Sequence, residues 1–216
     1  MRHIAWAAIA TLALAFGTVA LHAEPARPVK IVAFGDSLTA GLGLPVSQGF
    51  APRLQAALIA KGDAVEVINA GVSGSTASDG MARLDWSVPD GTEAVILELG
   101  ANDMLRGLNP QVTREALTTI LRRLSERHIH VLLCGMRSAP NLGSDYARSF
   151  EGVYPELAAA FGVPLYPFFL DGVAADPKLL QNDGLHPNAA GVDVIVARIL
   201  PDVEALIAEV RKSRSP

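Results

Sequence analysis

Short apolar runs alternate with longer amphipathic segments along the chain from residue 29 onward. Each run is flanked by glycine, proline or polar residues, and a run of this kind predicts a strand that is buried on both faces. The predicted strands are Val29–Phe34, Val65–Asn69, Ala94–Leu99, Val131–Cys134 and Val163–Tyr166.

The longer segments between these runs have the apolar and polar pattern of amphipathic helices. The predicted helices are Phe50–Ala60, Ser75–Trp86, Val112–Glu126, Tyr146–Phe161 and Asn188–Arg211. Pro201 lies inside the last helix and predicts a break or kink near Leu200, because proline has no backbone N–H to donate. The polar end, Lys212–Pro216, is expected to fray.

Strands that alternate with helices predict an α/β fold in which helices cover both faces of a parallel sheet. We expect a three-layer α/β/α sandwich with a five-stranded parallel sheet. All strands of such a sheet point the same way, so the loops that follow them meet at one edge. Chemistry is expected at that edge, and glycine occurs in the loops after the first four predicted strands.

The first 23 residues differ in kind from the rest of the chain. Met1–His3 supplies a positive start, Ile4–Leu21 contains no charge, and the stretch ends in the small residue Ala23. This pattern predicts a cleaved secretory signal peptide over residues 1–23, with a retained membrane anchor as the alternative. We expect residues 24–216 to form a single periplasmic or secreted domain, with no stable membrane insertion after cleavage.

Charge and cysteine content narrow the set of partners. The whole chain carries a formal net charge of −4, and removal of the signal peptide takes away only Arg2 and leaves −5. There is no basic run with interleaved aromatic residues, so nucleic acid is not expected as a partner. The only cysteine, Cys134, lies in an apolar run and is expected to be an inert buried thiol. The sequence predicts no cofactor and leaves the oligomeric state open.

Ser37 is the candidate nucleophile. The apolar run Val29–Phe34 is broken by Gly35, which places the Ser37 hydroxyl at the edge where open α/β folds bind ligands. Gly35 and Gly41 allow the backbone to turn sharply around it. The alternative is that Asp36 and Ser37 are only turn and helix-capping residues.

A serine hydroxyl is a poor nucleophile unless a base takes its proton, and His186 is the candidate base. It lies three positions after Asp183 in the loop Gln181–Asn188, close enough for that carboxylate to orient the imidazole. The alternatives are ordinary turn residues, or a metal site, although two ligands fall short of a usual zinc set. The other histidines lie in the predicted signal peptide or at the opposite edge of the predicted sheet: His3, His22, His128 and His130.

Acyl transfer to serine also requires hydrogen-bond donors for the oxyanion. Two of the edge loops offer them: the backbone amide of Gly74, where the missing side chain permits close approach, and the side-chain amide of Asn102. The alternative for Asn102 and Asp103 is a turn or cap pair ahead of the next helix.

Four motifs together resemble the four ordered sequence blocks of the SGNH hydrolases, also called GDSL lipases. They are Gly35-Asp36-Ser37-Leu38, Gly74 in its Ser-Gly-Ser-Thr context, Gly100-Ala101-Asn102-Asp103, and Asp183-Gly184-Leu185-His186. The similarity covers essentially all of the mature chain and extends to the bacterial periplasmic acyl-CoA thioesterase I, lysophospholipase and arylesterase group. It implies a flavodoxin-like SGNH hydrolase fold and cleavage of carboxylic esters or thioesters through an acyl-enzyme.

The resemblance also implies a role for each matching residue. Ser37 would be the nucleophile and the first oxyanion donor, joined by the backbone of Gly74 and the side chain of Asn102. His186 would act as general base and then general acid, oriented by Asp183. Two neighbouring positions depart from the usual pattern without removing a catalytic atom: Ala101 stands where glycine is frequent, and Ser75 where aspartate is frequent.

Apolar residues in the edge loops predict a groove for an acyl chain or an aryl group. The substrate is expected to be a small acyl ester, a thioester or a lysolipid. One alternative is a carbohydrate acetylesterase of the same superfamily, which would need a polar cleft, and another is a non-catalytic periplasmic binding module. The candidate groove residues are Leu105, Leu108, Met136, Pro140 and Leu185, with Met104, Leu142, Phe168 and Phe169 nearby.

Overall fold

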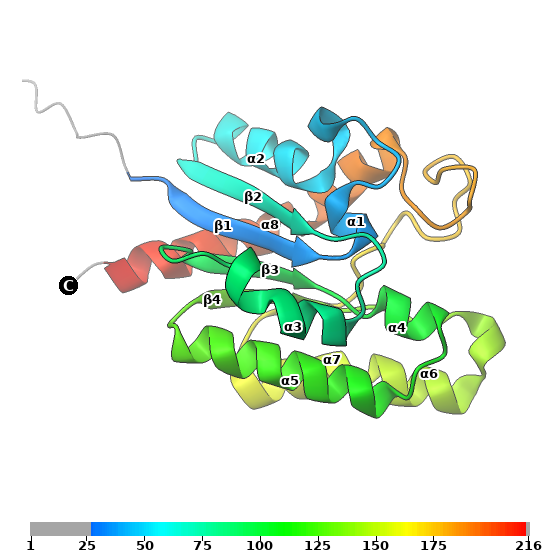
Figure 1. Cartoon of the computed structure of the whole chain (residues 1–216). Helices are drawn as coiled ribbons and strands as arrows, with labels where there is room; N and C mark the ends of the chain where they lie inside the picture. The colour runs from blue at the N-terminus through cyan, green and yellow to red at the C-terminus, as the bar shows by residue number, and fades with distance from the viewer. Residues whose placement is uncertain (1–26, 215–216) are drawn as a thin grey trace, which may run out of the picture.

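A computed structural model describes residues 27–214. At its centre is a five-stranded parallel sheet with the strand order β2-β1-β3-β4-β5 (Figure 1). The predicted α/β sandwich with a parallel sheet is therefore confirmed. The strands are β1 (Val29–Gly35), β2 (Val65–Gly71), β3 (Ala94–Glu98), β4 (His130–Cys134) and β5 (Leu165–Tyr166).

Helices cover both faces of the sheet, with α2 and α8 packed together on one face and α3, α5 and α7 in the layer on the other (Figure 1). Two short 3-10 turns, η1 (Val46–Gln48) and η2 (Pro140–Leu142), lie in the connections. The helices are α1 (Ser37–Ala40), α2 (Phe50–Ala60), α3 (Ala77–Ser87), α4 (Ala101–Leu105), α5 (Pro110–Glu126), α6 (Ser144–Glu151), α7 (Val153–Phe161) and α8 (Ala189–Arg214).

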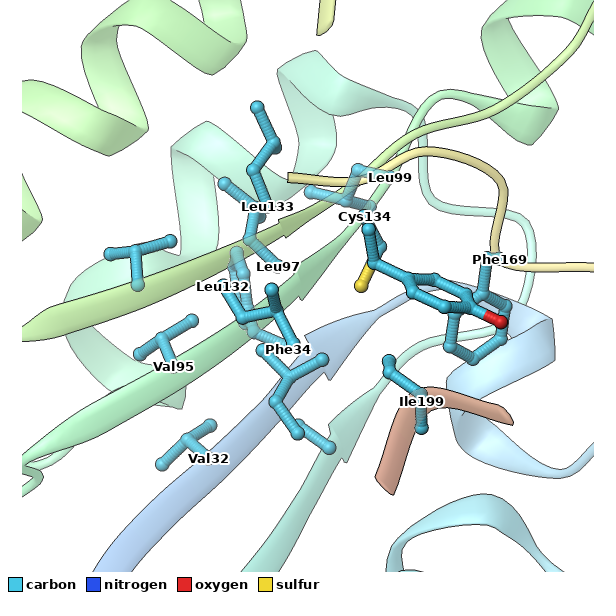
Figure 2. Close-up of a cluster of buried hydrophobic side chains, with 14 of the residues drawn as sticks. Val32, Phe34, Val95, Leu97, Leu99, Leu132, Leu133, Cys134, Phe169 and Ile199 are labelled. Atoms are coloured by element: carbon cyan, nitrogen blue, oxygen red, sulfur yellow. The ribbon is translucent and has the colours of Figure 1, made fainter. Parts of the chain in front are cut away.

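The core lies between the sheet and these two helical layers. Phe34 of β1, Leu97 of β3, Leu132 of β4 and Ile199 of α8 are all fully buried. Figure 2 shows them among the side chains that the central strands and α8 contribute to one cluster. Since both faces of the sheet are covered, its central strands carry continuous apolar runs instead of alternating: Ile31–Phe34, Ala94–Leu97 and Val131–Cys134.

Of the five predicted helices, only Phe50–Ala60 has the observed bounds, and two of the differences have a clear local cause. The helix expected to begin at Ser75 begins at Ala77, because the Thr76 side chain accepts a hydrogen bond from a backbone N–H of the first turn. The segment 146–161 was expected to be one helix and is instead two, α6 and α7, separated at Gly152. Glycine has a low helix propensity, which favours an interruption there.

The break expected near Leu200 is wrong, since α8 continues through Pro201 from Ala189 to Arg214, and the kink expected there as the alternative stays a prediction. Pro201 is exposed to solvent, whereas Ile199 and Val203 on either side of it are fully buried. The apolar packing of the helix against the sheet therefore outweighs the hydrogen bond that proline cannot make.

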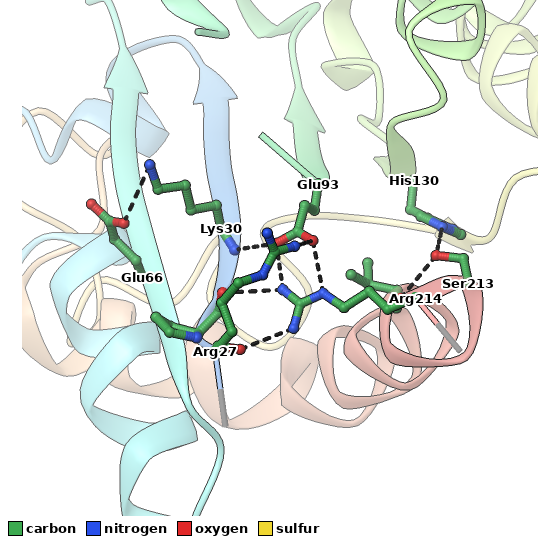
Figure 3. A network of polar contacts seen from close by, with 9 residues as sticks. Arg27, Lys30, Glu66, Glu93, His130, Ser213 and Arg214 are labelled. Atoms are coloured by element: carbon green, nitrogen blue, oxygen red, sulfur yellow. Dashed lines mark hydrogen bonds and ion pairs between the residues drawn. The ribbon is translucent and has the colours of Figure 1, made fainter. Parts of the chain in front are cut away.

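The end of α8 is tied to the edge of the sheet (Figure 3). Arg214 Nε donates to Glu93 Oε1 over 2.8 Å, and Arg214 Nη1 donates to the Arg27 carbonyl oxygen over 2.9 Å. The expected fraying of Lys212–Pro216 is therefore wrong for residues 212–214, and residues 215–216 lie outside the described part of the chain.

The predicted signal peptide over residues 1–23 also lies outside the described residues. It stays a prediction, as does the single domain over residues 24–216. Within residues 27–214, no helix combines the length and the apolar character that crossing a membrane requires.

Replacing Pro201 with alanine should stabilise the protein, because it restores the N–H that α8 lacks at an exposed position. We expect Pro201→Ala to raise the free energy of unfolding by about 1–3 kcal/mol, measured by urea denaturation. Glu209→Ala, an exposed substitution in the same helix, is the control and should change it by less than about 0.5 kcal/mol. A variant no more stable than the parent would show that α8 has already adapted to proline.

Candidate active site

Ser37 lies on a sharp turn between β1 and α1. Asp36 caps α1 with its side chain, and Ser37 is the first residue of the helix, with 8% of its surface exposed. A Cβ atom at Gly35 would lie 2.1 Å from Thr39 Oγ1 and 2.5 Å from the Glu98 carbonyl oxygen, so no residue larger than glycine fits. The tight turn therefore holds the hydroxyl at the carboxyl end of the central strand.

His186 lies directly beside this hydroxyl, although the two residues are 149 positions apart in the sequence. His186 Nε2 is 2.9 Å from Ser37 Oγ, and His186 Nδ1 is 2.6 Å from Asp183 Oδ2. The structure thus brings the three predicted residues into one continuous chain of hydrogen bonds. Both imidazole nitrogens take part in these bonds, and no group of three or more His, Cys, Asp or Glu side chains within residues 27–214 is placed to hold a metal ion.

The Asp183 carboxylate is ionised and sets the tautomer of His186. The other oxygen of its carboxylate accepts the backbone N–H groups of His186, over 3.0 Å, and Leu185, over 2.9 Å. These two backbone bonds, followed by the bond from the His186 ring, lower the pKa of Asp183 to about 2. An ionised carboxylate favours a proton on Nδ1, which leaves Nε2 to accept the Ser37 proton.

The loop that carries His186 is hydrogen-bonded to the segment that follows α1. Gln181 Nε2 donates to the carbonyl oxygen of Leu42 over 2.7 Å and to that of Pro187 over 2.9 Å. Leu42 lies just beyond α1, so this side chain ties the histidine loop to the segment that follows the nucleophile.

The loops after β2 and β3 bring the other two predicted residues to the same edge. Gly74 adopts a φ of +82°, a conformation that favours glycine. A Cβ atom there would have only the Arg106 guanidinium within 4 Å, at 3.9 Å, so backbone conformation and not close approach explains this glycine. The backbone N–H groups of Gly74 and Ser37 have no hydrogen-bond acceptor within residues 27–214.

Asn102 is more constrained than the sequence suggested. Its Nδ2 donates to Asp36 Oδ2 and to the Ser75 carbonyl oxygen, each over 3.1 Å. An amide nitrogen carries two hydrogens, so both are already used. Asn102 reaches an oxyanion only if one of these bonds is exchanged.

Two buried carboxyl groups lie beneath the nucleophile. Glu98 Oε2 accepts Thr39 Oγ1–H over 2.8 Å and the Asp36 backbone N–H over 3.3 Å, whereas Glu98 Oε1 has no partner in the described part of the chain. Burial, reinforced by the neighbouring Asp36 charge, raises the pKa of Glu98 well above 4.5. Burial also raises the pKa of Asp36 from 3.8 to about 6, against the opposing hydrogen bonds from Leu38 and Asn102.

In the sequence, Asp36 belongs to a motif and is a possible helix cap, whereas Glu98 belongs to none of the four motifs. The structure shows that Asp36 also holds the Asn102 amide. A signal for Glu98 was present, since it is the only charged residue in the apolar run Ala94–Leu99. A charge in a strand buried on both faces marks a site that requires explanation.

A cavity of about 280 Å³ opens beside Ser37 and His186. Of the residues predicted to form a groove, four line this cavity: Leu105, Met136, Pro140 and Leu185. Leu108 lies outside it, and its carbonyl oxygen accepts the Tyr146 hydroxyl over 2.9 Å. Of the nearby candidates, Leu142 does not line the cavity either, and Phe169 is a core residue packed edge-on against Phe50 with ring centroids 5.1 Å apart. The apolar lining includes Leu38, Met104, Leu105, Met136, Pro140, Phe168, Leu180 and Leu185.

The remaining histidines of the described chain lie elsewhere, as predicted. His128 and His130 line a separate groove at the opposite edge of the sheet, near the start of β4. His130 Nε2 lies 3.2 Å from Ser213 Oγ, which makes a second serine–histidine contact far from Ser37 (Figure 3). Cys134 is buried, and burial raises the pKa of its thiol well above the ordinary value, in line with an inert role.

Fold and site together define the class of protein. In this parallel α/β/α sandwich, a serine, a histidine and an aspartate are joined by hydrogen bonds beside an apolar cavity. This is the arrangement of a serine-dependent ester hydrolase. Residues 33–194 match the GDSL-like Lipase/Acylhydrolase family, and the chain belongs to it. It is a carboxylic ester hydrolase of that family.

Individual relatives agree with this assignment. Esterase TesA of Pseudomonas aeruginosa is 35% identical over 87% of this chain and 94% of its own length. Thioesterase 1/protease 1/lysophospholipase L1 of Escherichia coli K12 is 38% identical over 79% of this chain and 81% of its own. The crystal structure of AlinE4, an SGNH-hydrolase family esterase, superposes with a TM-score of 0.71 at 44% identity, covering 83% of this chain and 96% of that one.

Because the pKa of Asp36 is raised, the free energy of unfolding should depend on pH. A carboxyl group whose pKa rises on folding stabilises the fold fully below its unfolded pKa of 3.8, and this contribution is lost as the pH rises through about 6. The uncharged variant Asp36→Asn does not titrate. We therefore expect its stability, relative to the wild type, to improve from pH 4 to pH 7 in urea denaturation.

The absolute stability of Asp36→Asn also reflects its altered bond to Asn102, so the pH trend is the measurement that matters. Asp90→Asn, at a fully exposed position, is the control for removing a surface carboxylate. Parallel pH profiles for wild type and Asp36→Asn would contradict the raised pKa.

Proposed function

We propose that this protein hydrolyses acyl esters or thioesters with an apolar acyl or aryl group, through an acyl-enzyme on Ser37. The observation that carries the proposal is the hydrogen-bonded chain from Ser37 through His186 to Asp183, which opens onto the cavity. A binding module would have no need of this geometry.

The proposed chemistry follows from these contacts. His186 Nε2 takes the Ser37 proton as the oxygen attacks the substrate carbonyl carbon, and the Asp183 carboxylate stabilises the imidazolium that forms. The imidazolium then gives its proton to the leaving alcohol or thiol, and an acyl-enzyme remains. Water, deprotonated by His186, attacks this ester, and the imidazolium returns its proton to the Ser37 oxygen as the acid is released.

The oxyanion would be held first by the backbone N–H groups of Ser37 and Gly74, which lack other acceptors. We propose that Asn102 joins them by giving up its bond to the Ser75 carbonyl oxygen. The bond to Asp36 would be retained, since a hydrogen bond to a carboxylate is stronger than one to a neutral carbonyl. Asp36 would thus hold Asn102 in position for the transition state.

The cavity favours an acyl chain or aromatic ring over a sugar. Met104, Met136 and Leu180 are buried on its wall, while Leu105 and Leu185 are about half exposed. This apolar lining argues against the carbohydrate acetylesterase alternative, which requires polar partners for hydroxyl groups. Esters, thioesters and lysophospholipids that carry a single apolar chain therefore form the proposed substrate class.

Ser37→Ala should abolish both covalent labelling by a fluorophosphonate and hydrolysis of a p-nitrophenyl acyl ester, because it removes the attacking oxygen. The measurements are mass spectrometry of the intact protein and release of p-nitrophenol. Ser213→Ala removes the serine of the other serine–histidine contact and should label and turn over like the wild type. Persistent labelling of Ser37→Ala would place the nucleophile elsewhere.

Asn102→Ala should lower kcat by roughly 10²–10³, the usual loss for one oxyanion donor. KM should change much less, since this donor acts mainly in the transition state. Asn109→Ala, which removes the cap of α5, is the control for a loss of stability in the same region. Wild-type kcat in a folded Asn102→Ala variant would remove Asn102 from the oxyanion site.

A further inference from the structure

Arg137 stands apart from the other arginines of the described chain. It is exposed, and it is the only arginine within residues 27–214 whose guanidinium has neither a hydrogen bond nor an ion pair with the protein. The adjacent carboxylate of Glu151 accepts the backbone N–H of Ser138 over 3.0 Å and does not pair with Arg137. Five N–H donors are therefore open to a ligand.

The guanidinium is nevertheless held in place. Arg137 Cζ lies 4.8 Å from the centroid of the Phe168 ring, and both residues line the cavity beside Ser37. The backbone on either side is fixed, since Gly135 N–H donates to the Tyr166 carbonyl oxygen over 2.8 Å and Ser138 N–H to Glu151. Stacking restricts the side chain while leaving its hydrogen-bonding edge free.

The charges around the cavity also favour an anionic ligand. No Asp or Glu belongs to its lining, and Arg137 is its only side chain with a permanent charge. The chain as a whole is acidic, with a formal net charge of −4, so a lone cation at this position is not a general property of the surface. The cavity thus combines an apolar wall with one positive group at its exposed side.

We propose that Arg137 is a specificity-determining residue that binds an anionic oxygen group, a phosphate or a carboxylate, carried by the substrate. The inference rests on the proposed hydrolysis at Ser37 and narrows its substrates to amphiphiles with an apolar chain and a negative group. The planar guanidinium matches the paired oxygens of either anion. The anion belongs either to the leaving group or to the far end of the acyl chain.

Two substrate pairs separate these sources. Octanoyl-CoA against octanoyl-pantetheine varies the phosphates of the leaving group, and mono-p-nitrophenyl suberate against its methyl ester varies a carboxylate on the acyl chain. We expect the wild type to prefer the anionic member of one pair. Arg137→Gln should lower kcat/KM for that substrate roughly tenfold, mainly through KM, and leave the uncharged partner unchanged.

Two further variants serve as controls. Arg137→Lys keeps the charge but loses the planar fork, and it should retain part of the preference. Arg122→Gln removes the same charge from an exposed position on α5, away from the cavity, and should keep the full preference. Added salt should reduce the wild-type preference, because the contact is exposed.

The outcomes distinguish the inference from the proposed function. If the wild type and Arg137→Gln hydrolyse the uncharged substrates equally and discriminate equally within both pairs, the anion site is overturned while hydrolysis at Ser37 stands. An equal loss on charged and uncharged substrates would also overturn it, since that indicates a structural role. A wild type that hydrolyses none of the four substrates and takes up no fluorophosphonate would refute both.

Discussion

The place of β1 between β2 and β3 is the constraint on which the site depends. In the parallel register Gly35 pairs with Gly71 on one side and with Glu98 on the other, so three strands end at the same level. The loops that follow carry Ser37, Gly74 and Asn102. Because β1 is hydrogen-bonded to a strand on each side, the turn that carries Ser37 is supported by the interior of the sheet and not by an edge strand.

Buried carboxyl groups also lie at the turn that carries Ser37. Asp36 and Glu98 are both fully buried at the nucleophile turn, where an apolar pair would fold with less cost. Asp36 holds the Asn102 amide, and Glu98 accepts the Asp36 backbone N–H and the Thr39 hydroxyl. The carboxyl groups thus connect the turn to the loop after β3, which accounts for polar groups in an otherwise apolar layer.

The cavity has two chemically different parts. One end of the cavity carries the hydrogen bonds that join Ser37, His186 and Asp183, whereas its wall consists largely of methionine and leucine side chains, which are flexible and apolar. Arg137, stacked on Phe168, is the one permanently charged side chain in this lining.

The sequence by itself determined the parallel sheet, because the alternation of apolar runs and amphipathic segments is a local property of the chain. The order of its motifs also placed Ser37, Asp183 and His186 in loops predicted to meet at one edge of that sheet. Tertiary structure decided what depends on neighbours distant in sequence. The Asn102 amide is engaged by Asp36 and Ser75, the end of α8 is held by Glu93, and Leu108 lies outside the cavity. Burial and pairing of this kind are set by packing, which no periodicity in the sequence records.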